Sequence, residues 1–438
     1  MRRDGSCPQA TNGSGSYQFR AAARTGNGAV AVGAYAGIGN LVYYGFVPFA
    51  RFYSAFCPFP YTGNPLRVMH IVKLVALILA CPVALILLVV IAAVCFLAFS
   101  PSVGPAPDKA AQDRYRQKTD LFYDGQFHND KLAPTPLFTG EIQEPSSRRV
   151  PEQTLPAVKI TSFPRAESGK LTATWLGHAS VLLQFGASNI FLDPMLSDRA
   201  SPLQFAGPKR FSELPLAIED VPEIDVAFIS HDHYDHLDLR TIKGIDAKVR
   251  AYVVPLGVDV ILRAWGVDEK KIHALFWYES VELAGVTFTL TPAQHRTGRH
   301  PRKPNRTLWS GVHMTDGAHG VYYTGDTGYC GVFKEIRERF GEVDLAIVQN
   351  GQYDRGWAKI HMFPDESAQA IQELGAKVTL PVHWASFCIC NHAWDEPIIK
   401  LTEAAERAGF ALATPRIGET VDYDEIEKYR EKWWREYN

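Results

Sequence analysis

Four side chains of types that commonly bind metal ions lie within six residues of the chain, in the pattern His-x-His-x-Asp-His. They are His231, His233, Asp235 and His236, and they follow the β-type run 225-DVAFIS. Imidazole and carboxylate groups are the usual protein ligands of zinc and similar divalent ions. In an extended segment His231 and His233 point to the same side, so both can reach one ion. Asp235 and His236 are adjacent and diverge, which suits a second ion nearby.

Three more residues of these types, His295, Asp326 and His383, each follow another β-type run. A sheet delivers the ends of separate strands to one edge, so residues far apart in the sequence can converge there. Two ions about 3.5–4 Å apart need a bridging acid. Asp326 lies beside a glycine at a strand end and can expose both oxygens, so it is the candidate bridge. His295 then completes the first ion site and His383 the second.

The elements that must position these residues begin near residue 166. The β-type runs, bounded by Gly, Pro and Asp, are 171-LTATWL, 179-ASVLLQF, 189-NIFLD, 225-DVAFIS, 250-RAYVV, 285-GVTFTLT, 321-VYYT, 343-VDLAIV and 377-KVTLPV. Helices are expected at 331-GVFKEIRERFG and at 365-DESAQAIQELG, the second with Asp365 as its N-cap. Strands dominate first and then alternate with helices, which predicts an α/β domain over 166–438 with sheets inside and helices outside.

The wording and order of six segments resemble the N-acyl-phosphatidylethanolamine-hydrolysing phospholipase D group of the metallo-β-lactamase superfamily. The segments are 175-WLGHASVLLQF, 191-FLDPMLSDRASPLQFAGPKRF, 230-SHDHYDHLDL, 291-TPAQHRTGR, 323-YTGDTGYC and 382-VHWASF. The resemblance implies an αββα sandwich, two zinc ions and a hydrolase that cleaves phosphodiesters of N-acyl-phosphatidylethanolamine-like lipids.

The resemblance also implies which residues act. The implied ligands are His231, His233 and His295 for one zinc, Asp235, His236 and His383 for the other, and Asp326 between them. Every one of these positions carries the expected residue type. The segment 350-NGQYDRGWAKIHMFPDESA is similar to a Gly-x-Tyr stretch of the family that precedes a histidine. His361 is therefore a candidate pocket residue, and with Asp235 and Asp326 it completes the expected catalytic set.

Several residues near these motifs have two readings. Asp193 either hydrogen-bonds a ligand histidine and fixes its tautomer or simply ends a strand in an Asp-Pro turn. His178, in Gly-His-Ala-Ser, is expected to be structural rather than catalytic. Cys388 and Cys390 could form a separate thiolate–imidazole zinc site with His383 and His392, but Cys-x-Cys is not the usual spacing for zinc, and His383 is already assigned to the main site. We expect the two cysteines to make loop or apolar contacts.

The chain ahead of this domain is unlike it. Residues 1–70 hold six Arg, one Asp and ten Gly with little periodicity, so we expect a disordered or non-native extension, with a working start near Met69. Leu74–Phe99 has no charged residue, and at about 1.5 Å per residue it is long enough to cross a hydrocarbon layer of roughly 30 Å. This predicts a single membrane-spanning helix over 71–100. It is longer than the apolar core of a signal peptide, and the flanking charges leave its orientation open.

Residues 101–165 contain nine prolines, which disfavour long helices, and we expect a linker that becomes an arm on the following domain. The whole chain of 438 residues is 46% hydrophobic and 21% charged, which excludes a largely disordered protein. A net charge of −2 and the lack of a basic stripe weigh against a nucleic-acid partner and hence against a nuclease. Seven cysteines are too few for a disulfide scaffold at this length.

The sequence thus predicts a single-pass membrane protein that hydrolyses a phospholipid or another small molecule. A homodimer is compatible with the sequence, and the side of the membrane on which the catalytic domain lies is left open. A lactone, ester or amide hydrolase of the same fold is an alternative, because such a site also accepts a strained carbonyl. A tethered metal-binding module without turnover is an alternative of another class. Metal analysis and a substrate panel separate these three hypotheses.

Overall fold

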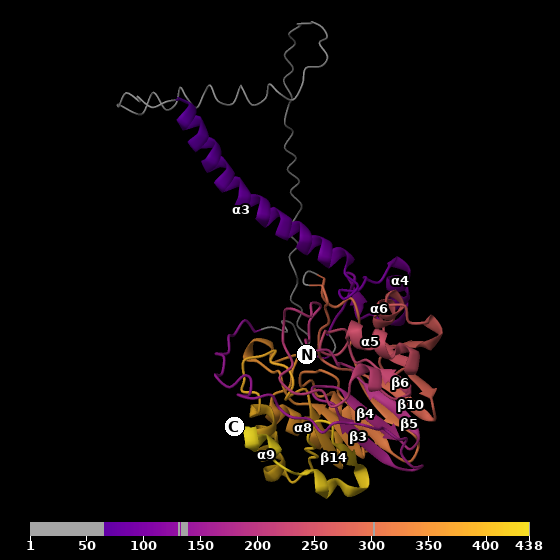
Figure 1. Ribbon diagram of the computed structural model, residues 1–438. Coiled ribbons are helices and arrows are strands. Elements are labelled where there is room, and N and C mark those ends of the chain that lie inside the picture. The colour runs from indigo at the N-terminus through magenta and orange to yellow at the C-terminus, as the bar shows by residue number, and fades with distance from the viewer. Residues whose placement is uncertain (1–64, 130–131, 133–138, 301–302, 438) are drawn as a thin grey trace, which may run out of the picture. The chain divides into compact units, whose positions relative to one another are not determined.

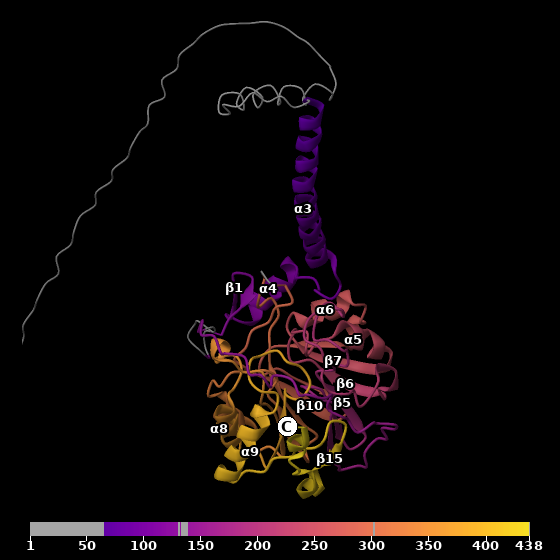
Figure 2. The ribbon, with the colours of Figure 1, turned by 60° about the vertical axis from the view of Figure 1, so that its left-hand side comes forward.

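The computed structural model describes residues 65–129, 132, 139–300 and 303–437 (Figures 1 and 2). The expectations for residues 1–64 lie outside the described residues. Contacts between residues divide the chain into two units, Met1–Leu85 and Ile86–Asn438. The second unit contains every strand and every helix described below, except that the long helix Pro65–Phe99 crosses the boundary between the two units.

Two β-sheets form the centre of the second unit. The first has seven strands in the order β15-β3-β4-β5-β6-β7-β8, and the second has six in the order β14-β13-β12-β11-β10-β9. The first sheet contains β3 (Leu171–Trp175), β4 (Val181–Phe185), β5 (Ser188–Leu192), β6 (Ile224–Phe228), β7 (Val249–Pro255), β8 (Ile272–Leu275) and β15 (Thr420–Asp422). The second contains β9 (Ser280–Leu283), β10 (Val286–Thr291), β11 (Gly311–Thr315), β12 (Gly320–Tyr323), β13 (Leu345–Gln349) and β14 (Val378–Val382).

The sheets change from antiparallel to parallel pairing along their order. Strands β15, β3, β4 and β5 pair antiparallel, and β5 to β8 pair parallel. In the second sheet β9 to β12 pair antiparallel, and β12 to β14 pair parallel. In the parallel sets the carboxyl ends of neighbouring strands meet at one edge, where polar loops can gather.

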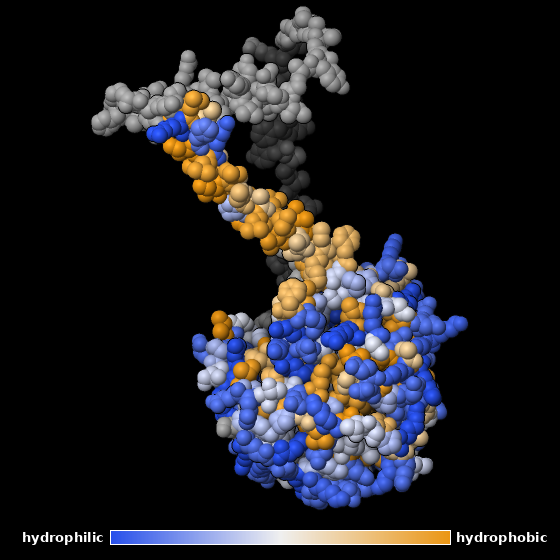
Figure 3. Space-filling view, viewed as in Figure 1, coloured by the Kyte–Doolittle hydropathy of each residue, from blue (hydrophilic) through white to orange (hydrophobic). Residues whose placement is uncertain are grey.

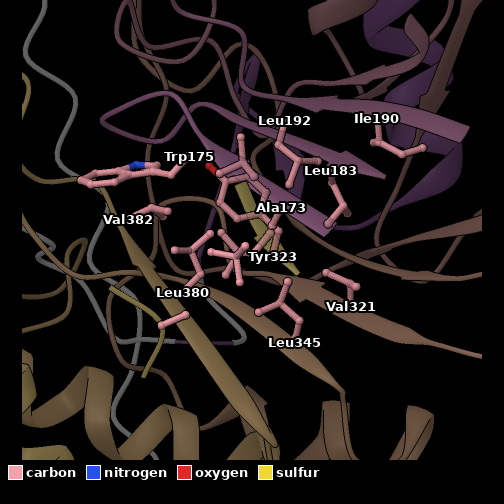
Figure 4. Packing of buried hydrophobic residues seen from close by; sticks show 14 of the residues in the cluster. Ala173, Trp175, Leu183, Ile190, Leu192, Val321, Tyr323, Leu345, Leu380 and Val382 are labelled. Carbon is pink, nitrogen blue, oxygen red and sulfur yellow. The ribbon is translucent and has the colours of Figure 1, made fainter. Parts of the chain in front are cut away.

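The main hydrophobic core lies between the two sheets. Leu183 and Leu192 of the first sheet belong to the same buried cluster as Leu345 and Leu380 of the second. Figure 4 shows these side chains facing one another across the space between the strands. Each fully buried leucine contributes roughly 1.5–3 kcal/mol of transfer free energy, so the paired sheets form a rigid base for the loops at their edge.

Helices cover both outer faces of the paired sheets. Helices α5 (Leu239–Ile245) and α6 (Val258–Ala264) pack on the first sheet, and α7 (Val332–Phe340), α8 (Pro364–Leu374) and α9 (Glu396–Ala408) pack on the second. Figures 1 and 2 show α5 and α6 on one side and α8 and α9 on the other. The architecture is the αββα sandwich that the sequence predicted.

The predicted elements match the structure closely, with one clear error. All nine predicted β-type runs overlap strands, whereas β8, β9, β11, β15 and the helices α5, α6 and α9 were not predicted. The expected N-cap at Asp365 is wrong, because α8 starts earlier, with Phe363 as its cap. Pro364 fits the first helical position, where an N–H would have no partner. The Phe363 N–H donates to the Glu366 carboxylate at 2.9 Å.

The segment expected to be a linker and arm contains α4 (Lys109–Lys118) and a hairpin of β1 (Phe122–Tyr123) and β2 (Gln126–Phe127). Asp108 caps α4 by accepting from the Ala111 N–H at 2.8 Å. Tyr115 and Phe127 share a buried cluster with Trp309 of the sandwich. This part of the chain therefore contributes to the packing of the second unit.

Helix α3 (Pro65–Phe99) is the long apolar helix. The most apolar 18-residue window within Leu66–Phe99 has a mean hydropathy of 3.3, and none of that window is buried by the rest of the protein. Figure 3 shows its apolar side chains on the surface. By length and composition this helix is a candidate membrane span, and it includes the predicted apolar run Leu74–Phe99.

Candidate metal centre

Five loops at one edge of the paired sheets bring the predicted site residues together. His231 to His236 follow β6, His295 follows β10, Asp326 follows β12 and His383 follows β14. His361 comes from the loop between β13 and α8. All eight predicted residues fall into groups whose ligand atoms lie within 4.8 Å of one another. The sequence-based expectation that these distant residues converge agrees with this geometry.

Three imidazoles form the first group, which we call the histidine trio: His231, His233 and His295. The His231 Nε2 lies 2.9 Å from His233 Nδ1, and the His295 Nε2 lies 3.2 Å from the same atom. All three side chains are buried or nearly so. Three ring nitrogens that face one point without a carboxylate between them can supply three of the four ligands of a tetrahedral zinc site.

The second group combines histidines with a carboxylate, and we call it the acid cluster: His178, Asp235, His236 and His383. The Asp235 Oδ2 accepts from His178 Nε2 at 2.8 Å. The same oxygen lies 3.3 Å from His383 Nε2 and 3.4 Å from His236 Nε2. The Nε2 atoms of His236 and His383 are 3.1 Å apart. These atoms therefore enclose a second point where a cation fits.

Asp326 lies between the two groups, as expected for a bridging acid. Its Oδ2 is 3.2 Å from His236 Nε2 and 3.1 Å from His383 Nε2 in the acid cluster. In the trio, the distance from Asp326 Oδ2 to the Nε2 of His231 and to that of His295 is 3.9 Å. The other oxygen, Oδ1, is buried and finds no hydrogen-bond partner among the described residues.

Asp193 holds the acid cluster from behind. Its carboxylate accepts from His236 Nδ1 at 2.7 Å, from Tyr323 Oη at 2.6 Å, and from the Ser230 N–H and Oγ at 2.7 and 2.6 Å. Because a carboxylate only accepts, His236 must carry a proton on Nδ1, and Nε2 is the ring nitrogen that faces the cluster. Of the two readings of Asp193, the geometry favours the one that fixes a ligand tautomer.

Backbone carbonyls and a hydroxyl orient three of the remaining histidines in the same way. His295 Nδ1 donates to the Ile360 carbonyl at 2.9 Å, and His383 Nδ1 donates to the Gly351 carbonyl at 3.3 Å. His231 Nδ1 lies 2.9 Å from Ser230 Oγ. The Nε2 atoms of these histidines therefore face inward.

Three residues at the site hold a left-handed backbone that side chains other than glycine rarely adopt. They are His178 (φ 53°), Asp193 (φ 41°) and His383 (φ 73°). The His383 N–H donates to the His178 carbonyl at 2.8 Å, and that carbonyl also accepts from Trp175 Nε1 at 2.9 Å. The loop after β3 and the end of β14 are thus fixed to each other, which keeps these strained residues in place.

The two groups differ in how they hold protons. In the trio, burial lowers the pKa of His233 and of His295 to about 3, and the pKa of His231 falls well below its usual value. In the acid cluster, burial also acts to lower the pKa of His383, but the carboxylates of Asp326 and Asp235 outweigh it and raise the pKa to about 9. The pKa of His236 rises well above 6.5, again against the effect of burial, because Asp326, Asp235 and Asp193 lie around it.

The residues present fit a pair of divalent cations. The trio offers neutral imidazoles, which are the form that binds metal. In the acid cluster, protons on the histidines neutralise the carboxylates of Asp235 and Asp326. A bound cation would supply that positive charge in place of the protons. The unpartnered Asp326 Oδ1 is a further buried acceptor with no protein donor. Zinc suits this set of nitrogen and carboxylate oxygen donors.

Two residues with uncertain or minor roles in the sequence also reach the centre. His178, expected to be structural, hydrogen-bonds Asp235, and its Nδ1 is buried without a partner among the described residues. His361 Nδ1 lies 3.9 Å from Asp326 Oδ2 and is likewise unpartnered. A histidine after a glycine at a strand end was the available signal for His178, and its φ could not be read from sequence.

Sequence reasoning missed Arg299, which is buried beside the ligand loop. Its Nη1 donates to the Asp232 and Leu237 carbonyls at 2.7 and 2.8 Å, on either side of the His233–His236 stretch. Its Nε and Nη2 donate to the Ser102 carbonyl at 2.9 and 2.7 Å. Arg299 therefore connects the segment after α3 to the loop that carries four candidate ligands.

The alternative thiolate site gains no support from this geometry. Cys390 is buried and Cys388 is half-buried, and neither joins a metal-ligating group among the described residues. The Cys388 thiol contacts the Cys390 carbonyl at 3.6 Å. His392 Nε2 instead accepts from the Gln352 N–H at 2.9 Å. The two cysteines make the loop contacts that were expected.

Comparison with known proteins gives the same family as the sequence motifs. Residues 188–384 match the beta-lactamase superfamily domain family. N-acyl-phosphatidylethanolamine-hydrolyzing phospholipase D 1 of Caenorhabditis elegans is 36% identical over 296 residues, which are 64% of this chain and 82% of that protein. An uncharacterized protein of Mycobacterium tuberculosis is 33% identical over 342 residues, which are 75% of this chain and 91% of that protein.

A solved metallo hydrolase from the archaeon Ignicoccus hospitalis aligns with a TM-score of 0.46 at 19% identity, over 58% of this chain and 98% of that one. The sequence relatives and the αββα sandwich with its strand-end His and Asp residues show the family. The chain belongs to the metallo-β-lactamase superfamily, in the group of proteins similar to N-acyl-phosphatidylethanolamine-hydrolysing phospholipase D, and is a metal-dependent hydrolase by family.

Proposed function

We propose that this protein is a membrane-anchored dinuclear zinc phosphodiesterase of phospholipase D type that acts on N-acyl-phosphatidylethanolamine-like lipids. The observation that carries the proposal is the convergence of seven candidate ligands, with Asp326 between the trio and the acid cluster. A relative that aligns with this chain over most of its own length is named for this activity. The apolar helix α3 supports the membrane part of the proposal.

In this proposal His231, His233 and His295 hold one zinc, and Asp235, His236 and His383 hold the other, with Asp326 shared. Bound zinc ions would make hydroxide available near neutral pH and neutralise charge on phosphoryl oxygens. Asp193 keeps the proton of His236 on Nδ1, so that Nε2 stays available as a ligand. His178 holds Asp235 through its Nε2–H, which fixes the carboxylate in the acid cluster.

His361 is the residue that we propose meets the substrate. Its side chain is 12% exposed, against 3% for that of Asp326, so it lies toward the open side of the centre. Its Nδ1 has no partner among the described residues and lies 3.9 Å from Asp326 Oδ2. Burial holds the pKa of His361 well below its usual value, so the neutral ring can donate one hydrogen bond to a phosphoryl or leaving oxygen.

The membrane span would keep the domain beside its lipid substrate. α3 ends at Phe99, and the sandwich begins with β3 at Leu171. Between them Ser102, α4 and the β1–β2 hairpin contact the domain, and the Ser102 carbonyl accepts two hydrogen bonds from Arg299. This short tie would restrict the domain to the neighbourhood of the bilayer surface, where long-chain phosphodiesters are concentrated.

The test is a substrate panel with the full chain, reconstituted with zinc in vesicles. We expect release of phosphatidic acid from N-acyl-phosphatidylethanolamine and its loss on chelation. The matched variants are Asp326→Asn, which removes the shared carboxylate charge, and His313→Gln, at a buried histidine stacked on Phe340 outside the metal centre. Activity on lactones alone would support the alternative hydrolase, and no metal with no turnover would support the tethered module.

A further inference from the structure

A cavity of about 420 Å³ lies in the second unit where α3 ends, next to the ligand loop but outside the metal centre. One wall is the last part of the apolar helix and the segment after it. The other walls are α6 and the loop before β11. The lining includes Val94, Leu97, Ile261, Asp232, Lys303 and Arg306.

The polar wall of this cavity carries an excess of positive charge. Lys303 and Arg306 line it, and neither forms an ion pair with an acidic group of the described residues. Asp232 is the one acidic residue of the lining, and its carboxylate is already engaged by the Gly298 N–H at 2.9 Å. Arg306 is half-buried, and burial lowers the pKa of its guanidinium. A partly desolvated cation without a counter-charge is stabilised when an anion binds.

The apolar wall fixes what kind of anion fits. Val94 and Leu97 belong to the last two turns of α3, close to its end at Phe99, and Ile261 of α6 lies opposite the segment after the helix. In a membrane-spanning helix these last turns lie at the boundary between acyl chains and headgroups. Cations beside an apolar wall at this level match the phosphate and the first carbons of a phospholipid.

We propose that this cavity is a binding site for the phosphate group of an anionic phospholipid in the leaflet next to the catalytic domain. The proposal rests on the membrane-anchoring part of the proposed function and not on the phosphodiesterase chemistry. The occupant is a lipid that stays bound, held by Lys303 and Arg306 at its phosphate and by α3 along its chains. The site is separate from the zinc ligands, because none of the residues that line the cavity belongs to a metal-ligating group.

The cavity is connected to the ligand loop through its inner wall. Asp232 lies between His231 and His233 in sequence, and its carbonyl accepts from Arg299 at 2.7 Å. Arg299 also lines the cavity and holds the Ser102 carbonyl. A lipid bound here would therefore order the segment that Arg299 ties to the ligand loop, so its binding is expected to stabilise the domain as well as hold it at the surface.

The test measures lipid retention by the full chain in detergent, with native mass spectrometry as the readout. The probes are phosphatidylserine, phosphatidylcholine and soluble glycerol 3-phosphate. The variant is Lys303→Ala with Arg306→Ala, and the control is Arg240→Ala with Lys243→Ala, which removes the same charge from exposed positions on α5. We expect wild type and control to bind phosphatidylserine in preference to phosphatidylcholine and the cavity variant to bind it roughly 30-fold more weakly.

Each other outcome contradicts the proposal in a specific way. Equal weakening in the cavity and α5 variants would show that bulk charge binds the lipid. Equal retention of phosphatidylcholine would remove the role of charge, and binding of glycerol 3-phosphate as tight as that of phosphatidylserine would make it a free-phosphate site. The variant Lys303→Arg with Arg306→Lys should restore binding if folding is intact. All arms are repeated in Asp326→Asn, so that loss of catalysis and loss of lipid binding are measured separately.

Discussion

The histidine trio and the acid cluster lie side by side at the same edge of the paired sheets, yet the trio and the His236–His383 pair of the acid cluster hold charge in opposite ways. The trio is buried, and the pKa values of His233 and His295 fall to about 3. The acid cluster is just as buried, but there the pKa of His383 rises to about 9. Burial alone therefore does not decide the protonation of these histidines.

The difference comes from where the carboxylates stand. Asp326 Oδ2 is 3.1 Å from His383 Nε2 in the acid cluster but 3.9 Å from His295 Nε2 in the trio. Within the acid cluster Asp235 lies beside His383, and Asp193 holds His236 from behind. Two neighbouring cation sites built this way are expected to differ in affinity, because the acid cluster brings more negative charge to its ion.

The largest effect is expected at the residue shared by both groups. In Asp326→Asn the geometry is nearly kept but the bridging charge is lost, so activity should fall by about 1000-fold or more. Steady-state hydrolysis with zinc-reconstituted protein measures this. The His313→Gln protein should keep its activity, and full activity in Asp326→Asn would refute the shared-carboxylate scheme.

Removing one ligand from each group separates the two sites. His233→Gln should lose the trio ion and keep the other, whereas Asp235→Asn should lose the ion of the acid cluster and keep the trio ion. Zinc content by mass spectrometry should then fall from about two to about one per chain in each variant. If either change empties both sites, the trio and the acid cluster do not bind their ions independently and are not two separate sites.

A smaller effect is expected behind the acid cluster. Asp193→Asn removes the charge that holds His236 Nδ1–H at 2.7 Å. Outer partners of this kind typically change metal affinity by about 10–100-fold. A chelator titration should show weaker zinc binding at one of the two sites only. Equal weakening of both sites would mean that Asp193 acts on the fold and not on His236.

The smallest effect is expected at His178. His178→Gln removes the hydrogen bond that His178 Nε2 donates to Asp235 at 2.8 Å. A typical hydrogen bond contributes about 1 kcal/mol. Activity should fall by less than about tenfold, with both zinc ions retained. Loss of one zinc in this variant would make His178 a ligand and not a positioning residue.

The strand-end residues of the candidate metal centre could be predicted from the sequence because their signal is local. An alternating or apolar run followed by His or Asp marks a strand and its loop without knowledge of the rest of the chain, as at His295 and Asp326. The His-x-His-x-Asp-His segment needs only its own spacing. Strands that come first and then alternate with helices predicted sheets inside and helices outside, and the resemblance to the family implied the αββα order.

The parts that the sequence did not predict depend on long-range contacts. Arg299 ties Ser102 to the ligand loop across 197 residues, and nothing in 291-TPAQHRTGR marks which arginine does so. Strands β9 and β11 alternate polar and apolar residues over only four and five residues, and they are stabilised by pairing with β10. The N-cap of α8 was misplaced because Asp365 has the favoured side chain, while Pro364 before it already fits the first helical turn.

The central claim is that the trio and the acid cluster hold two ions that share Asp326. Zinc K-edge X-ray absorption of the zinc-loaded full chain measures this directly, because a neighbouring zinc scatters far more strongly than a light atom. The account predicts imidazole nitrogen and carboxylate oxygen ligands with a zinc–zinc distance of about 3.5–4 Å. A spectrum of zinc with light-atom neighbours alone, at two zinc ions per chain, would contradict it.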